Sequence, residues 1–393
     1  AEARLPSRER PPMPGDAIRC PPPPDELAQL TAEPLVWFDA ERGNLVAGIE
    51  QAFTLGRYEH GVELTCAIGN YLDIAGHYDD AERLYRLAVD QSREHGDRRG
   101  EAAALLGLVV LWTNGPEPDP DQAMAAATRA VELFDQLGDL AGRVKALEGV
   151  SYLHHRGGRV DEALRCAEAA LALPDPAHPD VRGSLWLTHG FAHFARGDYA
   201  AAEESYAHAL ELARARGLRV TEALALRALG SVQRRHGEHR AAERNLRSAL
   251  AIMDELDYPS ARAAVLLTLG QLQADMGLPE ARSTLDRALA ACRRLGVGYG
   301  QGLALATLGE LHCADGRPDQ AVHVCQTALD VLGDLDEPLL RATVLRTLGT
   351  ARRALGEHRA AVEAWRAARE LHLRLGNTAE AEEVAALLRS ASE

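Results

Sequence analysis

The sequence predicts an all-α fold, a right-handed superhelical solenoid of about eight helical hairpins, from three observations. A glycine recurs at intervals of 38 to 42 residues, each copy lies in a stretch with helical apolar spacing, and small residues recur in the stretch that follows. A fixed period of this size is typical of solenoids, in which each unit packs against its neighbours. The recurring glycines are Gly69, Gly107, Gly149, Gly190, Gly230, Gly270, Gly309 and Gly349.

The beginning of the chain does not fit this pattern. Residues 1–33 are rich in proline, which suits neither a helix interior nor a central strand, so we interpret them as a linker or the end of an upstream domain. The first residue is alanine and not methionine, as expected of a fragment. Residues 34–57 then predict one amphipathic helix covering the first repeat, because apolar side chains recur at helical spacing. They are Leu35, Phe38, Leu45, Ile49 and Phe53.

The repeats occupy residues 58–376, and their template is clearest from Thr221 onward. The first helix of this copy has an apolar face formed by Leu224, Leu226 and Leu229. Gly230 allows a neighbouring helix to approach where a side chain would collide, and Gly237 ends the helix. In the second helix, Ala242 and Ala249 lie seven residues apart, two turns along one face, so the two helices can pack closely.

Two copies of the template are irregular, and the last is followed by a cap. Residues 114–122 predict a longer loop in the second repeat, and three prolines in residues 172–180 shorten the second helix of the third. Residues 377–393 predict a C-terminal capping helix with one apolar face, as terminal repeats require.

The template resembles the tetratricopeptide repeat, whose small-residue positions match Gly230, Ala242 and Ala249. The usual unit has about 34 residues. The longer period here is more similar to the long-helix variants found in bacterial signal-transduction ATPases and kinesin light chains. The resemblance implies that the first helices line a concave groove, where ligands or partner segments lie.

A second resemblance lies directly before the repeats. The segment looks like the W-[FL]-D-A-E-R-x-N-L stretch that opens the C-terminal repeat region of SARP-type (antibiotic regulatory protein) STAND regulators of actinobacteria. Its matching residues are Trp37, Phe38, Asp39, Ala40, Glu41, Arg42, Asn44 and Leu45. Alternatively, these residues only begin an amphipathic helix anchored by Trp37 and Phe38.

The second resemblance implies a larger protein. In that family a winged-helix DNA-binding domain, a transcriptional activation domain and an NB-ARC ATPase precede the repeats. Residues 1–33 would then be the tail of the nucleotide-binding region, and ATP or ADP would bind only in that upstream part. Relatives of this type assemble upon activation, so the full-length protein would form homo-oligomers.

Composition and absent motifs narrow the function classes. The formal charge is −15, from 43 Lys and Arg against 58 Asp and Glu, and such a surface repels nucleic acid. No apolar run is long enough for a membrane span, and the six cysteines lack CxxC spacing, as in a reduced, cytoplasmic protein. No phosphate-binding loop, nucleophile elbow or metalloprotease motif occurs, so we expect no enzyme activity and no cofactor in this chain.

The groove positions are predicted three residues before each template glycine and one, four and five after it, on one helical face. Read down the chain, they give an apolar half and then an arginine-rich half that would bind a peptide, a protein segment or a small-molecule effector. Alternatively, the apolar residues are inter-repeat core and the arginines a solvated face. The residues are Leu108, Leu111, Trp112, Val150, Leu153, Leu187, Phe191, Phe194, Arg227, Arg234, Arg235, Arg346 and Arg353.

Polar residues replace the leucine before the template glycine in two adjacent repeats. Glu148 and His189 occupy these positions, which predicts a buried ion pair that responds to pH or ligand, or a satisfied core pair without regulatory meaning. Zinc is a weaker alternative, because no HExxH or CxxC frames the nearby candidates. These candidates are His189, His193, His312, Cys313, His323 and Cys325.

Two functions of different classes follow. The first is a ligand- or partner-sensing repeat domain of a transcription regulator of secondary metabolism (antibiotic biosynthesis), which controls an upstream ATPase and DNA-binding part. The alternative is a stand-alone scaffold that binds a partner helix or peptide.

Overall fold

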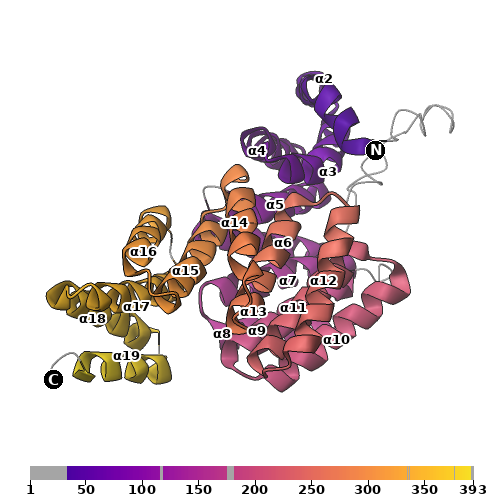
Figure 1. Cartoon of the computed structure of the whole chain (residues 1–393). Coiled ribbons are helices and arrows are strands. Elements are labelled where there is room, and N and C mark those ends of the chain that lie inside the picture. Colours follow the sequence, from indigo (N-terminus) through magenta and orange to yellow (C-terminus); the bar gives the residue numbers. More distant parts are fainter. Residues whose placement is uncertain are drawn as a thin grey trace. The chain divides into compact units, whose positions relative to one another are not determined.

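A computed structural model describes residues 33–115, 118–174, 181–333, 335, 337–375 and 377–390. These residues form 18 helices, and no strand occurs among them, which confirms the predicted all-α fold (Figure 1). All but one residue of the proline-rich segment 1–33 lies outside the described part. Within that part, no helix is long and apolar enough to cross a membrane.

Sixteen of the helices follow one another along the chain as eight consecutive pairs, which we call hairpins, and every template glycine lies on the first helix of its pair. The hairpins are α3 (Tyr58–Ala75) with α4 (Tyr78–His95), α5 (Arg98–Asn114) with α6 (Pro120–Leu137), α7 (Leu140–Arg156) with α8 (Val160–Leu171), α9 (Val181–Arg196) with α10 (Tyr199–Arg216), α11 (Arg219–Arg235) with α12 (His239–Glu255), α13 (Pro259–Asp275) with α14 (Glu280–Arg294), α15 (Gly298–Ala314) with α16 (Pro318–Leu332), and α17 (Pro338–Ala354) with α18 (His358–Arg374). The remaining helices are α2 (Pro34–Thr54) and α19 (Thr378–Ser390).

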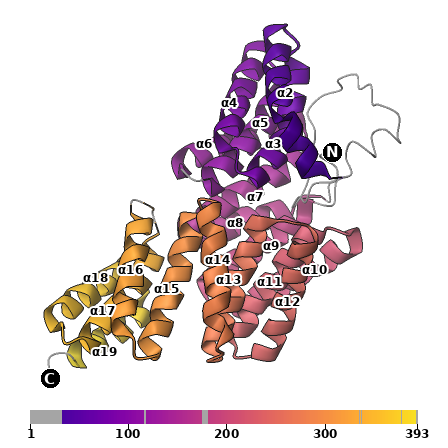
Figure 2. The same ribbon diagram turned by 45° about the horizontal axis from the view of Figure 1, so that its top comes forward.

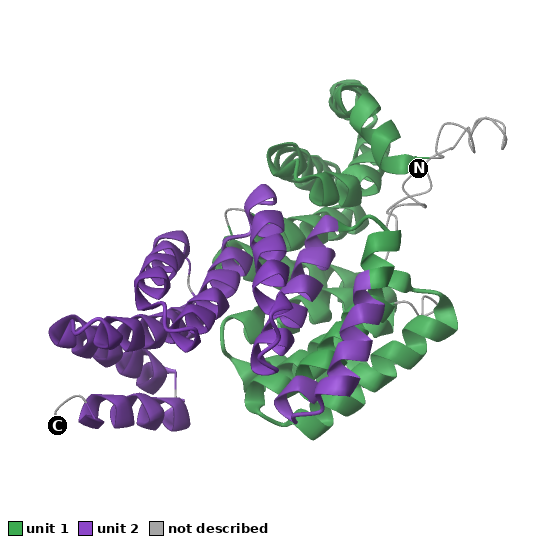
Figure 3. Ribbon diagram, viewed as in Figure 1, with its two compact units in different colours: residues 1–232, 251–258 green, residues 233–250, 259–393 purple. Residues whose placement is uncertain are grey.

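The chain divides into two compact units, shown in two colours in Figure 3. Residues 1–232 and 251–258 form unit 1, and residues 233–250 and 259–393 form unit 2. In unit 1 the first helices α3, α5, α7 and α9 contact one another in turn. In unit 2 α13, α15 and α17 do the same, and Figure 2 shows the hairpin partners α15 and α16 side by side. The first helices of each unit therefore form a continuous layer.

Glycine ends the helices as the template predicts. Gly237 has φ of 76°, a left-handed conformation that is strained for other residues. Its amide donates to the Arg234 carbonyl, and the next amide donates to that of Gln233. Both bonds satisfy carbonyls at the end of α11, so the chain turns directly into α12.

Several template glycines make room for large side chains of the second helix, as the interpretation of the repeat predicts. A Cβ atom added to Gly190 would lie 2.4 Å from the ring of Tyr206, and one added to Gly349 would lie 2.5 Å from that of Trp365. Both aromatic residues follow their glycine by sixteen positions and are at most 2% exposed. Gly149 differs, because its added Cβ would meet only Val109, at an ordinary 3.6 Å.

Two irregular features of the sequence have visible consequences. Helix α8 has only 12 residues, as the prolines that follow it predict. Helix α2 packs on the first hairpin through the segment that resembles the regulator family, residues 37–45. Phe38 stacks on Tyr71 with ring centroids 4.7 Å apart, and the Tyr71 hydroxyl donates to Asp39 at 2.8 Å. Arg42 of the same segment donates to Asp80 of α4 at 2.8 Å.

The five cysteines of the described residues are free thiols inside helices. Burial raises the pKa of Cys66 and of Cys325 to about 12 and that of Cys292 to about 11. These thiols are therefore protonated at neutral pH and act as small core residues.

Candidate partner-binding face

Six of the predicted groove residues are buried, which corrects the expected apolar groove in the first half of the chain. They are between 2% and 9% exposed and belong to the core: Leu108, Leu111, Trp112, Val150, Leu153 and Leu187. The contacts of Trp112 give the reason. Its indole nitrogen donates to Glu82 of α4 at 3.0 Å, and the Arg86 guanidinium lies 5.2 Å from the ring. The preceding second helix thus covers this position of α5.

The other predicted positions remain accessible to different degrees. Phe191 and Phe194 of α9 are half-buried in unit 1. In the arginine-rich half, Arg235 is exposed, and the other four arginines are half-buried: Arg227, Arg234, Arg346 and Arg353. The sequence pattern therefore identifies accessible positions from Phe191 of α9 onward, and core positions up to Leu187 of the same helix.

In unit 1, half-buried aromatic rings form a patch on α7, α9 and the start of α10. His155 of α7 lies 6.3 Å from Tyr152 and 6.1 Å from Phe191, measured between ring centroids. Phe194 lies 5.2 Å from Tyr199. We call these five residues the aromatic patch. Such rings supply large contact areas at partner interfaces.

Sequence reasoning missed three members of this patch. Tyr152 and His155 follow Gly149 by three and six residues, so they share a face of α7, but the template positions exclude that face. Tyr199 begins the second helix, where no groove position is expected. Burial lowers the pKa of His155 to about 4, and no hydrogen-bond partner of its Nδ1 atom is found among the described residues. Its ring is therefore neutral at pH 7.

A directional chain of hydrogen bonds lies beside the patch. An arginine can only donate, so Nδ1 of His193 accepts in the shorter contact of 3.2 Å with Arg196; the Asp198 carboxylate lies 3.5 Å from the same nitrogen. The other nitrogen of His193 then donates to Nε2 of His189 at 3.3 Å, and Nδ1 of His189 donates to Ser205 at 2.9 Å. The Ser205 hydroxyl donates onward to the Ala201 carbonyl at 2.7 Å. In this direction of donation, the assignment for His189 is a neutral ring protonated at Nδ1.

The predicted pair of Glu148 with His189 is wrong. The Glu148 carboxylate forms an ion pair with Lys145, one turn earlier on α7, at 2.7 Å. It also accepts a hydrogen bond from the Thr188 hydroxyl of α9 at 3.5 Å. His189 is engaged by Ser205 and His193 instead. The lysine one turn earlier satisfies Glu148, so adjacent template positions need not pair with each other.

We expect the free energy of unfolding to fall by about 1–2 kcal/mol between pH 7 and pH 5 through His155 and His189, after allowance for partial exposure. Burial lowers the pKa of each to about 4 from an ordinary 6.5. The unfolded chain therefore binds more protons between these values, and this stability is complete above pH 6.5 and lost toward pH 4. Urea unfolding at both pH values measures the loss. The variants His155→Phe and His189→Leu should each flatten the pH dependence, and an unchanged slope in both would contradict this assignment.

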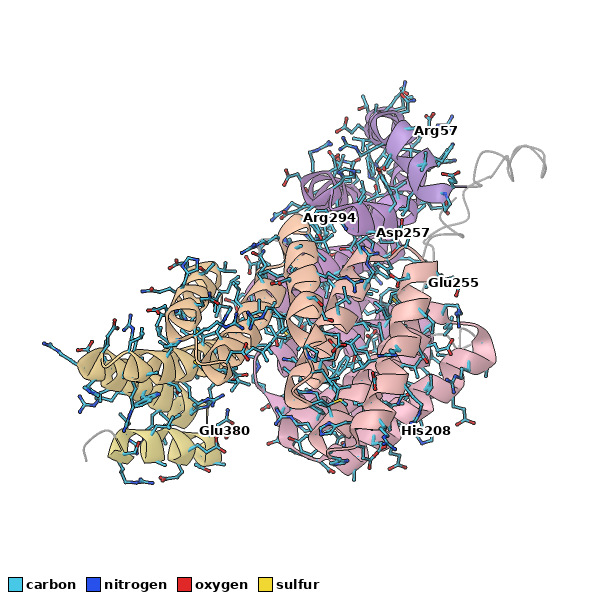
Figure 4. All side chains as sticks on the ribbon, viewed as in Figure 1. Arg57, His208, Glu255, Asp257, Arg294 and Glu380 are labelled. Atoms are coloured by element: carbon cyan, nitrogen blue, oxygen red, sulfur yellow. The ribbon has the colours of Figure 1, made fainter. Side chains whose placement is uncertain are left out.

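Another aromatic contact joins α9 to α10, the second helix of its hairpin. Trp186 of α9 stacks on His208 of α10, labelled in Figure 4, with centroids 4.8 Å apart. His208 is exposed. The edge of Trp186 also meets His189 at 5.6 Å. Trp186 thus lies between His189 of the hydrogen-bond chain and the exposed His208.

In unit 2 the accessible face of the first helices carries paired charges, which we call the charge ladder. Arg234 of α11 pairs with Asp275 of α13 at 2.6 Å. Arg346 of α17 pairs with Glu310 of α15 at 2.8 Å. Desolvation raises the pKa of Glu310, although the Arg346 guanidinium opposes that rise. Further along, Arg353 donates to Ser390 of α19 at 3.0 Å.

The charge ladder shows what the predicted arginines do. Two of them are matched by carboxylates from adjacent first helices, and the sequence template did not select those carboxylates. Because all four side chains retain 20% to 43% exposure, the pairs are solvated and exchangeable. A partner with its own charged groups can therefore displace them at modest cost.

A metal centre finds no support in the described residues. They contain no group of three or more histidine, cysteine, aspartate or glutamate side chains arranged to hold an ion. His189 and His193 instead bond to each other within the hydrogen-bond chain.

Two long stretches match the tetratricopeptide repeat family, residues 182–255 and 301–374. These two stretches carry tetratricopeptide repeats. The matched stretches cover α9 to α12 and α15 to α18, so the predicted repeat resemblance is confirmed.

The similarity to SARP-type regulators is also confirmed. The chain is 29% identical over 299 residues to the regulatory protein AfsR of Streptomyces griseus. The match covers 76% of this chain and 29% of that protein. The chain therefore spans less than a third of the curated relative it matches.

Solved structures share the fold at low sequence identity. The Rap conjugation gene regulator of plasmid pLS20, in complex with the Phr* peptide, has a TM-score of 0.59 and 14% identity, covering 86% of this chain and 97% of that one. A STAND protein with a tetratricopeptide repeat sensor, from Pyrococcus horikoshii, has a TM-score of 0.56 and 13% identity, covering 88% and 52%. A Rap protein complexed with competence and sporulation factor has a TM-score of 0.55 and 13% identity, covering 85% and 98%.

Proposed function

We propose that this chain is the ligand- or partner-sensing repeat domain of a cytoplasmic transcription regulator of secondary metabolism. It binds a peptide, a protein segment or a small effector on the accessible face of its first helices and passes that state to an upstream ATPase and DNA-binding part. The observation that carries the proposal is the 299-residue match to a regulatory protein. The STAND structure, in which such repeats serve as a sensor, supports it.

The accessible faces favour a peptide among these partners. The aromatic patch supplies apolar anchors, and the charge ladder supplies guanidinium and carboxylate groups that can pair with a peptide's charges. Two Rap proteins of the same fold were solved in complex, one with the Phr* peptide and one with competence and sporulation factor. A ligand changes the state of the regulator only if it binds one conformation of the repeats more tightly than another.

A peptide-display selection against the immobilised chain tests the binding face. We expect each selected peptide to lose at least tenfold in affinity with Phe194→Ala or with Arg234→Ala, because truncation of interface anchors costs about 2 kcal/mol or more. Fluorescence anisotropy titrations of the variants measure the loss.

Two substitutions on α18 are matched controls, because they remove the same kinds of side chain from a second helix. Leu373 is 48% exposed, and the Arg359 side chain is 94% exposed. Leu373→Ala and Arg359→Ala should change affinity less than twofold. If the peptides bind Phe194→Ala and Arg234→Ala as tightly as the unaltered chain, the aromatic patch and the charge ladder are not the binding site. Peptide binding that leaves ATP hydrolysis unchanged in a longer regulator carrying this chain would favour the scaffold alternative.

A further inference from the structure

Unit 1 also contains a pocket at the junction of α4, α5 and α6. It has a volume of about 400 Å³ and is lined by Ser92, Arg93, Gly96, Arg98, Glu101 and Arg129. A pocket of this size accepts a small organic molecule, since ligand sites span roughly 300–1,000 Å³. It lies where the end of α4 passes into the start of α5, and Arg129 reaches it from the middle of α6.

The charges that line this pocket are unbalanced. Glu101 is buried, with a side chain only 6% exposed, and it accepts from Arg93 at 2.9 Å and from Arg129 at 3.3 Å. Arg98 is exposed, and no hydrogen bond or ion pair engages its guanidinium group among the described residues. The lining groups therefore carry three positive charges and one negative charge.

Acidic groups near the pocket are engaged elsewhere. Asp97 caps α5 by accepting from the Gly100 amide at 2.9 Å. Glu132 holds a second nitrogen of Arg129 at 3.2 Å and is 55% exposed. Neither carboxylate lines the pocket, so neither occupies the space between the three arginines.

A buried hydroxyl group is the second sign of a ligand. Ser92 is fully buried, lines the pocket, and its Oγ atom has no hydrogen-bond partner among the described residues. Gly100 leaves this oxygen room, because a Cβ atom added there would lie 2.7 Å from it. A buried hydroxyl without a hydrogen-bond partner is unfavourable, unless a ligand supplies that partner.

We propose that this pocket binds a small molecule that carries a phosphate monoester. The lining charge of plus two matches the charge of about −1.5 to −2 that a phosphate monoester carries at pH 7. Guanidinium groups bind phosphate oxygens through paired hydrogen bonds, and Arg98 is available for this role. The Ser92 hydroxyl donates to the same group, and the remaining volume holds the organic part.

Calorimetric titration of the whole chain with O-phosphoserine, with inorganic phosphate and with serine tests the site. We expect saturable binding of O-phosphoserine, at least as tight as that of inorganic phosphate, and none of serine. Arg98→Ala should weaken O-phosphoserine binding at least tenfold, since a hydrogen bond to a charged group is lost. Ser92→Ala should weaken it severalfold, with an unchanged melting temperature of the free protein.

Arg99→Ala is the matched control. Arg99 is the next residue of α5 and carries the same charge, but it lies 3.8 Å from Asp139 and does not line the pocket. This variant should keep the affinity within twofold. Equal weakening by Arg98→Ala and Arg99→Ala, or no saturable binding, would overturn the proposal. Tighter binding of inorganic phosphate than of O-phosphoserine would overturn the assignment to a monoester.

Discussion

Replacement of Trp365 by alanine is expected to lower the free energy of unfolding of unit 2 by about 3–5 kcal/mol. The indole is 1% exposed and packs with Ala361, Ala368 and Val384, which lies on α19. Its nitrogen donates to the Arg346 carbonyl at 3.1 Å, on the first helix of the hairpin. Truncation would leave a cavity between three helices and remove the hydrogen bond from the indole to the Arg346 carbonyl, which keeps its bond from the Thr350 hydroxyl. Urea unfolding followed by circular dichroism measures the loss.

The same substitution at another tryptophan provides the control. Trp186 is half-buried and stacks on the exposed His208, so Trp186→Ala should cost only about 1–2 kcal/mol. Equal losses in the two variants would show that Trp365 does not close the last hairpin. Loss of the Trp365 contact should also disturb Arg346, which belongs to the charge ladder.

Most of the fold could be predicted from the spacing of one residue type. Gly190 and Gly349 must lack a side chain because a large ring lies against each backbone. A requirement of this kind recurs in several hairpins, so it contributes to the period in the sequence. The shortened α8 could be predicted as well, because proline ends a helix for local reasons.

The candidate site was predicted less completely, because exposure depends on the register between hairpins. Trp112 is buried through Glu82 and Arg86, which lie about thirty residues earlier, and no local pattern encodes that contact. The same limit explains why Glu148 was assigned to the wrong partner. Arg234 lies at an accessible position, yet its partner Asp275 could be recognised only once two first helices were placed side by side.

The central claim is that template glycines such as Gly190 and Gly349 are required because each receives a large side chain of the second helix. Gly190 and Gly149 occupy the same template position in adjacent repeats, but only Gly190 faces a ring. Gly190→Ala would place a Cβ atom 2.4 Å from the Tyr206 ring, which is 2% exposed and cannot move into solvent. Gly149→Ala would add only the 3.6 Å contact with Val109.

Urea unfolding of Gly190→Ala and Gly149→Ala, compared with the unaltered chain, tests this claim most directly. Alanine favours a helix over glycine by about 1 kcal/mol at either site, whereas overpacking costs about 1–3 kcal/mol at Gly190 alone. We therefore predict that Gly149→Ala is neutral or stabilising, and that Gly190→Ala is less stable than Gly149→Ala by up to about 3 kcal/mol. Equal stability of the two variants would contradict the account.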